Sequence, residues 1–195
     1  MQHIDLKKLP LIFKPKDLDQ LGLSRNQLTS LLAVGKVERV SWGLYRAKDS
    51  KATELETIAL VCKKFPQAVV CLFSALRVQS IGTQAPWEVW IALDRKARKP
   101  SVPGLPVRIV RFSGSMLQYG IVTKVVQGVP VKMTNPARTV VDCFRYRKKF
   151  GLDVALEALR DVVHRRLVTM DELVRVAEVC RARTVMRPYL ESLVS

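Results

Sequence analysis

The spacing of apolar and polar residues over the first fifty positions predicts two short helices. Ser24 followed by Gln27 has the spacing of a capping box, so a helix is predicted to begin at Arg25. Its inner face is defined by three leucines at the helical interval, Leu28, Leu31 and Leu32. A shorter helix at about 16–21 precedes it and is predicted to end at Gly22.

Two strand candidates follow these helices, at 36–41 and 44–48, and a tight turn at Trp42-Gly43 joins them. Two helices broken at a glycine and followed by a two-stranded ribbon are the pattern of a winged helix-turn-helix. Short helical pairs beside a hairpin also occur in domains that bind only proteins, so both interpretations stay open at this point.

The outer face of the second predicted helix favours DNA binding. Asn, Gln, Thr, Ser and Arg side chains can read base edges in a major groove, whereas a merely solvated face usually carries more Glu and Lys. The ribbon adds basic and aromatic side chains that can lie along the backbone or minor groove. The candidate DNA-binding residues are Arg25, Asn26, Gln27, Thr29, Ser30, Lys36, Arg39, Trp42 and Arg46.

Beyond the polar run 48–51, the predicted linker, the pattern indicates both strands and helices. Strands are predicted at 68–72, 87–93, 107–112, 121–126 and 129–133. Helices are predicted at 54–64, 75–79, 136–149, 152–166, 170–182 and 185–193, with caps at Thr53, Ser74, Asn135 and Thr169. The chain is therefore predicted to be α+β, with a winged helix-turn-helix at 1–50 and a mixed α/β domain at 51–195 that ends in helices.

A net charge of +16 over 195 residues favours a polyanionic partner, nucleic acid before an anionic membrane surface. Residues 51–134 alone carry twelve Lys and Arg against four Asp and Glu. A basic loop and the strand after it, with Arg108 and Arg111 expected on one face, predict a secondary basic surface. It can serve DNA backbone, an acidic protein or solubility, and its residues are Arg95, Lys96, Arg98, Lys99, Arg108 and Arg111.

Several classes of protein are disfavoured. No apolar run approaches the ~20 residues of a membrane helix, and the N-terminal residues lack the pattern of a secretory signal. We therefore expect a cytoplasmic protein without a membrane partner. The four cysteines lack the spacing of a zinc site or a disulfide framework and are expected to be buried, reduced thiols: Cys62, Cys71, Cys143 and Cys180.

Candidate chemistry is sparse. The two histidines, His3 and His164, have no cysteine or carboxylate at ligand spacing, so no metal site is expected. No glycine-rich phosphate loop or nucleophile elbow is present, and the prediction is no enzyme, no catalytic residue and no cofactor. Arg138 and Asp142, four residues apart, are expected to form a structural ion pair, with a phosphate clamp by Arg138 as the alternative.

Two segments of the chain resemble the AbiEi family of antitoxins. One is similar to the N-terminal winged domain of that family and reads GLSRNQLTSLLAVGKVERVSWGLYR. The other is similar to its C-terminal domain, with a T-x-P-A-R-T-x-x-D helix start and a long helix that matches G-x-D-x-A-L-E-A-L. The matching residues are Thr134, Pro136, Ala137, Arg138, Thr139 and Asp142, then Gly151, Asp153, Ala155, Leu156, Glu157, Ala158 and Leu159. The likeness covers roughly residues 10–165.

The resemblance implies the antitoxin of a type IV toxin–antitoxin pair, a system of phage resistance. Such antitoxins bind inverted repeats of double-stranded DNA in their own promoter and repress the operon. They counteract a nucleotidyltransferase toxin without forming a stable complex with it. By position, the readout helix would be 25–34, the wing 36–48, and 51–195 the antitoxin domain. The alternative is a basic protein-interaction module that docks an acidic partner without specific DNA binding.

Overall fold

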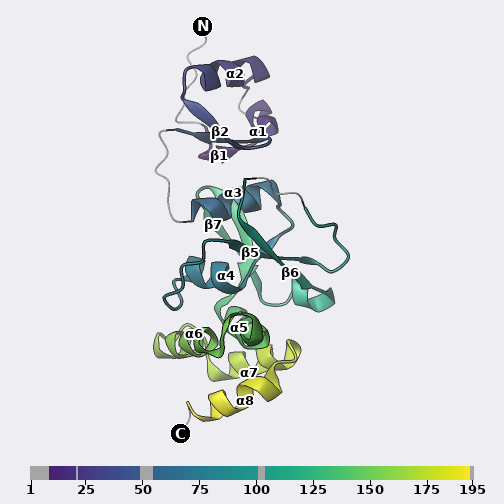
Figure 1. Cartoon of the computed structure of the whole chain (residues 1–195), viewed down its shortest axis with the longest axis vertical. Helices are drawn as coiled ribbons and strands as arrows, with labels where there is room; N and C mark the ends of the chain where they lie inside the picture. The colour runs from purple at the N-terminus through teal and green to yellow at the C-terminus, as the bar shows by residue number, and fades with distance from the viewer. Residues whose placement is uncertain (1–8, 21, 49–54, 101–103, 194–195) are drawn as a thin grey trace. The chain divides into compact units, whose positions relative to one another are not determined.

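Eight α-helices and two sheets make up the described part of the chain, residues 9–20, 22–48, 55–100 and 104–193 of a computed structural model (Figure 1). The fold is α+β, as predicted. The chain divides into two compact units. The first unit takes in 1–66, 100–106 and 124–131, and the second takes in 67–99, 107–123 and 132–195. The predicted boundary at residue 50 lies outside the described residues.

The first unit contains a three-stranded antiparallel sheet and three helices. The sheet has the order β1-β3-β2, with β1 at Ile12–Phe13, β2 at Val37–Ser41 and β3 at Leu44–Ala47. The helices are α1 at Pro15–Asp19, α2 at Arg25–Ala33 and α3 at Glu56–Lys64. The hairpin of β2 and β3 turns at Trp42-Gly43, where it was predicted. The predicted cap Thr53 lies outside the described residues.

A reciprocal cap starts α2. The Ser24 amide donates to Oε1 of Gln27 at 2.7 Å, and the Gln27 amide donates to Oγ of Ser24 at 3.3 Å. Two backbone N–H groups at the helix start are thereby satisfied, which stabilises the helix by about 1 kcal/mol. The predicted helix start at Arg25 is confirmed.

The apolar core of the first unit contains the inner face of α2. Leu28 and Leu31 are buried and Leu32 is partly buried. They pack with side chains from the other segments of the unit, namely Leu9, Phe13, Leu18 and Val37. Each fully buried leucine contributes about 1.5–3 kcal/mol. Because this face is committed to the core, the opposite face of α2 must be in contact with solvent or a partner.

Polar contacts connect α3 to the N-terminal segments. Nζ of Lys63 lies 2.7 Å from Oδ2 of Asp17 in α1, and Nζ of Lys64 donates to Oγ of Ser41 in β2 at 2.9 Å. Arg46 in β3 forms an ion pair with Glu56. The helix after the predicted linker therefore packs with the segments before it.

The second sheet has five strands in the order β6-β5-β4-β8-β7. They are β4 at Val69–Val70, β5 at Val89–Asp94, β6 at Val107–Phe112, β7 at Ile121–Val126 and β8 at Val129–Thr134. Strand β5 pairs in parallel with β6 and antiparallel with β4, and β4 pairs in parallel with β8. The sheet is therefore mixed, and β6 and β7 are its edge strands.

Helices complete the second unit. They are α4 at Leu72–Gln79, the short η2 at Gly114–Leu117, α5 at Pro136–Phe150, α6 at Leu152–His164, α7 at Met170–Val179 and α8 at Arg183–Glu191. The predicted caps Asn135 and Thr169 are confirmed, since each side chain accepts a hydrogen bond from an amide in the first turn of its helix. Helix α5 contacts α4, α6, α7 and α8 and is central to the core of this unit.

The predicted cap at Ser74 is wrong. Helix α4 begins at Leu72, and Ser74 is buried within it. The Ser74 hydroxyl accepts a hydrogen bond from the Trp90 amide at 2.8 Å and donates one to the Glu88 carbonyl at 3.4 Å. A buried hydroxyl requires partners, and the backbone at the start of β5 supplies them.

The prediction that Arg108 and Arg111 share one face of their strand is also wrong. Strand β6 pairs with β5 without interruption, from Val107 opposite Val89 to Phe112 opposite Asp94. Side chains alternate between the two faces of a strand, so residues three apart lie on opposite faces.

Arg138 and Asp142 form a fully buried ion pair near the start of α5. Nε of Arg138 lies 2.9 Å from Oδ2 of Asp142, and both side chains are 0% exposed. The guanidinium also donates to the carbonyls of Tyr119 at 2.8 Å and Met116 at 3.1 Å. The structural ion pair is confirmed, and burial rules out the alternative of a phosphate clamp.

The electrostatics of this pair reflect its burial. Removal from water raises the pKa of the Asp142 carboxyl to about 6, while Arg138 and Arg145 lower it. Asp142 is therefore ionised at neutral pH and balances the charge of Arg138. All four cysteines are buried and free, as expected. No helix within the described residues has the length and apolar character to cross a bilayer.

Replacing Arg138 with Met is expected to destabilise the protein by about 3–5 kcal/mol, because the buried Asp142 would lose its closest countercharge and keep only Arg145, 3.5 Å from its Oδ1. Urea denaturation measures the change, with exposed Arg160→Met as the matched control, expected to shift stability by less than about 0.5 kcal/mol. Equal stability of the two variants would contradict the structural role of the pair.

Candidate nucleic-acid interface

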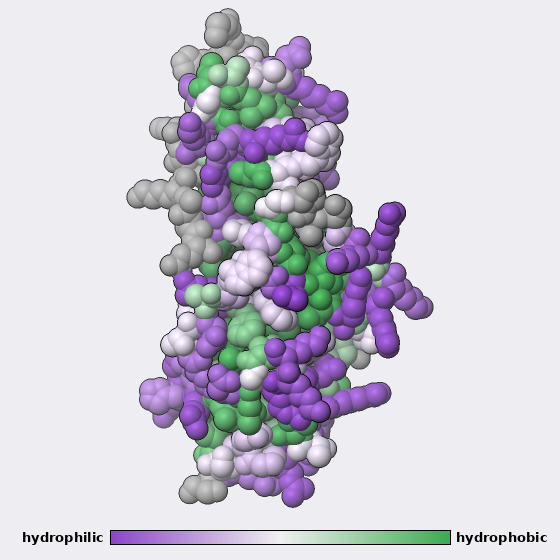
Figure 2. All heavy atoms as spheres, viewed as in Figure 1, coloured by the Kyte–Doolittle hydropathy of each residue, from purple (hydrophilic) through white to green (hydrophobic). Residues whose placement is uncertain are grey.

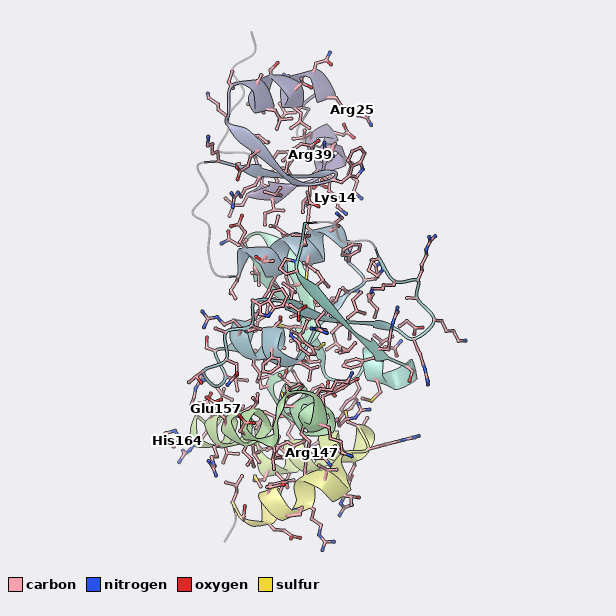
Figure 3. All side chains as sticks on the ribbon, viewed as in Figure 1. Lys14, Arg25, Arg39, Arg147, Glu157 and His164 are labelled. Atoms are coloured by element: carbon pink, nitrogen blue, oxygen red, sulfur yellow. The ribbon has the colours of Figure 1, made fainter. Side chains whose placement is uncertain are left out.

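The predicted polar face of α2 is accessible. Four of its side chains are exposed, Arg25, Asn26, Thr29 and Ser30, and Gln27 is partly buried. Arg25 projects from the first unit in Figure 3. Partial positive charge at the helix N-terminus lies beside Arg25 and Asn26, which makes this end of the helix suited to an anionic ligand.

The side chains of this face differ in how far they are already engaged. Gln27 belongs to the capping box. The hydroxyls of Thr29 and Ser30 donate to the carbonyls of Arg25 and Asn26, at 3.2 and 3.1 Å, so they can offer a ligand mainly acceptor lone pairs. Within the described part of the chain, the side chains of Arg25 and Asn26 have no hydrogen bond or ion pair. These two side chains therefore have free polar groups for a ligand.

The hairpin presents an exposed cation–π pair. The guanidinium carbon of Arg39 lies 4.4 Å from the centroid of the Trp42 ring, and Trp42 is 78% exposed. Stacking orients the guanidinium and leaves its N–H groups available for hydrogen bonds. Lys36, at the base of the hairpin, is also exposed.

Arg46 is placed differently from the other candidates. Its Nε lies 2.6 Å from Oε1 of Glu38, and its guanidinium also contacts Glu56. Hydrogen bonds from Glu56 and then Glu38 raise the pKa of Arg46. The side chain therefore joins β2, β3 and α3 and has less capacity for a ligand than Arg25 or Arg39.

A register shift in the hairpin explains why Arg46 pairs with Glu38. The sequence pattern did not indicate this shift. Ser41 pairs with Leu44, and continuing that register would put Arg39 opposite Arg46. An irregularity between Arg39 and Ser41 shifts the register by one residue, so Glu38 lies opposite Arg46 instead. The shift replaces a like-charge pair with an ion pair.

The secondary basic surface belongs to the second unit. Exposed cations follow β5 at Arg95, Lys96, Arg98 and Lys99, and none of these four side chains has an acidic partner among the described residues. Figure 2 shows long hydrophilic side chains projecting from the region of the loop between β5 and β6.

The two arginines of β6 are engaged, and one of them, Arg111, supports this loop. Nη1 of Arg111 donates to the carbonyls of Asp94 and Ala97, at 2.8 and 2.7 Å. Arg108 forms an ion pair with Glu88 at 2.9 Å and stacks on Trp90, with its guanidinium carbon 5.7 Å from the ring centroid. The free part of the basic surface is therefore the turn 95–99, which Arg111 holds against the strand.

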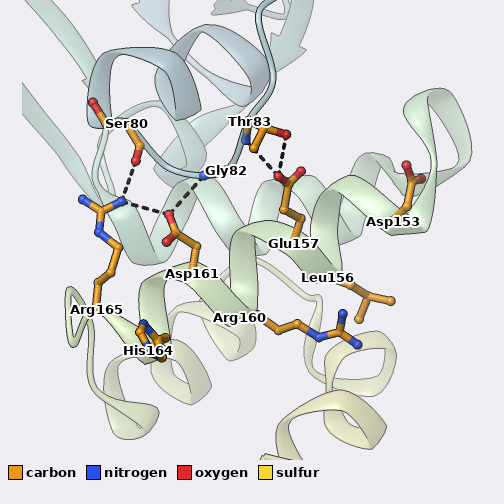
Figure 4. A pocket seen from close by; sticks show the side chains of 10 residues that line it. All are labelled: Ser80, Gly82, Thr83, Asp153, Leu156, Glu157, Arg160, Asp161, His164 and Arg165. Atoms are coloured by element: carbon orange, nitrogen blue, oxygen red, sulfur yellow. Dashed lines mark hydrogen bonds and ion pairs between the residues drawn. The ribbon is translucent and has the colours of Figure 1, made fainter.

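A groove in the second unit was not indicated by the sequence pattern. It has a volume of about 710 Å³ and lies between α6 and residues 80–84 (Figure 4). Oε1 of Glu157 accepts hydrogen bonds from the Thr83 amide at 2.9 Å and hydroxyl at 2.7 Å, and Oδ2 of Asp161 accepts one from the Gly82 amide at 3.0 Å.

Because they accept these hydrogen bonds, the carboxylates of Glu157 and Asp161 have a structural role. Hydrogen bonds from Thr83 and Gln84 lower the pKa of Glu157, so its charge is stabilised by the loop that it anchors. No cluster of three metal-ligating side chains occurs among the described residues. Arg165 is engaged as well, since its Nη1 lies 2.9 Å from Oδ2 of Asp161 and donates to the Ser80 carbonyl (Figure 4). The groove therefore offers a ligand the exposed side chains of Arg160 and His164.

Comparisons with known proteins identify a structural likeness only. No protein-family model and no curated protein matches the chain. The structure is similar to the crystal structure of RV2827C protein from Mycobacterium tuberculosis, with a TM-score of 0.60 and 15% sequence identity. The match covers 89% of this chain and 68% of that chain. At this identity the likeness shows the fold alone.

The different environments of Arg46 and Lys36 lead to a test. Arg46→Ala is expected to cost about 1–2 kcal/mol of stability, because it leaves the half-buried Glu56 without its partner. Lys36→Ala, in the same hairpin but exposed, is expected to change stability by less than about 0.5 kcal/mol. Urea denaturation followed by tryptophan fluorescence compares them, and an unchanged Arg46→Ala midpoint would argue against the ion-pair network.

Proposed function

We propose that this chain is a DNA-binding repressor and the antitoxin of a type IV toxin–antitoxin pair, with its first unit acting as a winged helix-turn-helix. One observation carries the proposal: α2 has a solvent-facing polar side whose Arg25 and Asn26 side chains are unengaged among the described residues. An exposed arginine–tryptophan pair in the neighbouring hairpin and the net charge of +16 support it.

The proposed contacts follow from the chemistry of each side chain. Helix α2 enters the major groove, where the Arg25 fork matches the two acceptors of guanine and the Asn26 amide matches adenine. Thr29 and Ser30 accept hydrogen bonds from base or water donors. Arg39, stacked on Trp42, lies along the backbone or minor groove together with Lys36.

Arg46 has a supporting role in this proposal. Its ion pairs with Glu38 and Glu56 fix the hairpin that carries Arg39. Loss of Arg46 would therefore weaken DNA binding indirectly, through the position of the hairpin. Two copies of the chain would occupy the two halves of an inverted repeat in its own promoter.

Fluorescence anisotropy with duplex DNA from upstream of the chain's own gene tests the DNA contact. Arg25→Ala is expected to weaken binding to this duplex by about 1–3 kcal/mol, because one base contact is lost. Arg175→Ala, which removes an exposed arginine from α7, is the matched control and is expected to leave binding nearly unchanged. Affinity is expected to fall steeply with salt, because phosphate contacts release counterions.

Equal binding to a scrambled duplex at moderate salt would overturn the specific repressor. Equal loss in Arg25→Ala and Arg175→Ala would show that net charge alone, rather than α2, determines binding.

The antitoxin part of the proposal rests on the resemblance of both segments to AbiEi antitoxins. Its test is co-expression with a nucleotidyltransferase encoded beside the gene. The chain is expected to restore growth, and Arg25→Ala is expected to keep this effect, because neutralisation is assigned to the second unit. No rescue by the wild-type chain would contradict the antitoxin assignment.

A basic protein-interaction module is the second candidate. The four cations at 95–99 without acidic partners among the described residues favour it. Retention of a stoichiometric acidic protein after nuclease treatment, together with no preference for the promoter duplex, would support this function over the repressor.

A further inference from the structure

One edge of the five-stranded sheet is an exposed strand of unusual composition. Strand β7 has the sequence IVTKVV and lies at the end of the strand order. Four of its six residues are exposed, including Val125 at 74% and Val122 at 38%. Edge strands usually carry several charges, a proline or a cover, because their unpaired N–H and C=O groups can pair with another chain. Lys124 is the one charged residue of β7.

The turn at the end of β7 determines which backbone groups point outward. Gln127 and Gly128 both have positive φ, 52° and 74°, as in a type I′ two-residue hairpin. In such a hairpin Val126 and Val129 form a hydrogen-bonded pair. Every second residue of β7 before Val126, at 124 and 122, then also directs its N–H and C=O groups toward β8. The N–H and C=O groups of residues 121, 123 and 125 therefore point away from β8, toward the open edge.

Pro130 agrees with this assignment. It lies opposite Val125, at a position where the hairpin requires no N–H group from β8. A proline there removes no ladder hydrogen bond between β7 and β8.

We propose that two copies of this chain associate by antiparallel pairing of their β7 strands, about a two-fold axis at Thr123. In this register Thr123 lies opposite Thr123 of the second copy, and Ile121 lies opposite its Val125. All three positions have outward backbone groups, so the hydrogen bonds and the β-branched cross-strand pairs form together.

Symmetry and charge select this register. Opposed residues of an antiparallel pair lie on the same face of the sheet, so a two-fold axis between identical strands passes midway between one residue and the same residue of the second copy. An axis at Lys124 would place two lysines opposite each other, which is unfavourable. An axis at Thr123 places Lys124 opposite Val122 instead. The pairing uses the β7 edge of both copies about a two-fold axis, so it closes at a dimer.

The overall charge predicts how this association responds to salt. Two chains of net charge +16 repel each other, and salt screens the repulsion. Dimerisation is therefore expected to strengthen as salt rises, whereas DNA binding is expected to weaken. The dimer does not depend on the proposed function, although a two-fold pair would suit an inverted repeat.

Sedimentation equilibrium of the full chain without DNA, at about 0.1 M and about 0.5 M salt, tests the proposal. A reversible monomer–dimer equilibrium that tightens with salt is expected. Thr123→Lys places like charges on the axis and is expected to raise the dissociation constant roughly fivefold or more. Thr123→Val keeps a β-branched side chain and is the matched control, expected to retain the dimer.

Lys124→Thr tests the register. It is expected to tighten dimerisation only slightly, because the two lysines are diagonal neighbours in this register, whereas an axis at Lys124 would make it tighten the dimer strongly. Circular dichroism checks that the variants are folded, as expected for substitutions at exposed positions. A chain that stays monomeric at both salt concentrations, or equal dissociation constants for Thr123→Lys and Thr123→Val, would overturn the proposal.

Discussion

The buried guanidinium of Arg138 is the interaction on which the second unit depends. It pairs with Asp142, donates to the carbonyls of Met116 and Tyr119, and lies 5.0 Å from the centroid of the Phe112 ring. A charge this far from water is tolerated only when its donors have partners. One side chain thereby connects the first turn of α5, the segment after β6 and the end of β6 itself.

Gly120 and the residues around Arg138 in the T-x-P-A-R-T-x-x-D segment, 134–142, fit this arrangement. Gly120 has φ of +66°, and a Cβ there would lie 2.9 Å from Cβ of Arg138, so a side chain would crowd the arginine. Asn135 caps α5 through the Arg138 amide at 2.8 Å. Thr134 and Thr139 share a buried hydroxyl hydrogen bond of 2.7 Å. The T-x-P-A-R-T-x-x-D segment, which carries the more specific part of the family resemblance, therefore has an architectural role in this fold.

The basic residues fall into two groups once their partners are known. Arg46, Arg108 and Arg111 each have partners in their own unit and stabilise a hairpin, a sheet edge and a turn. The side chains of Arg25 and of the four cations at 95–99 have none among the described residues. A basic composition indicates a polyanionic partner, but the residues available to meet one are those that the fold leaves unpaired. The contacts within the fold therefore determine which basic side chains can take part in the proposed function.

Local signals in the sequence determined most of the elements of this protein. The Ser24–Gln27 capping box, the Asn135 cap and the alternation over 107–112 each act within a few residues, so the helix starts and strand could be predicted. The exposed face of α2 followed as well, because three leucines at the helical interval fix which side is buried. The tertiary structure decided the rest: the hairpin register that engages Arg46, the partners of Ser74, and the anchoring of the loop at Thr83 by Glu157. Those contacts join segments distant in sequence or depend on a one-residue irregularity, and no local pattern encodes such pairings.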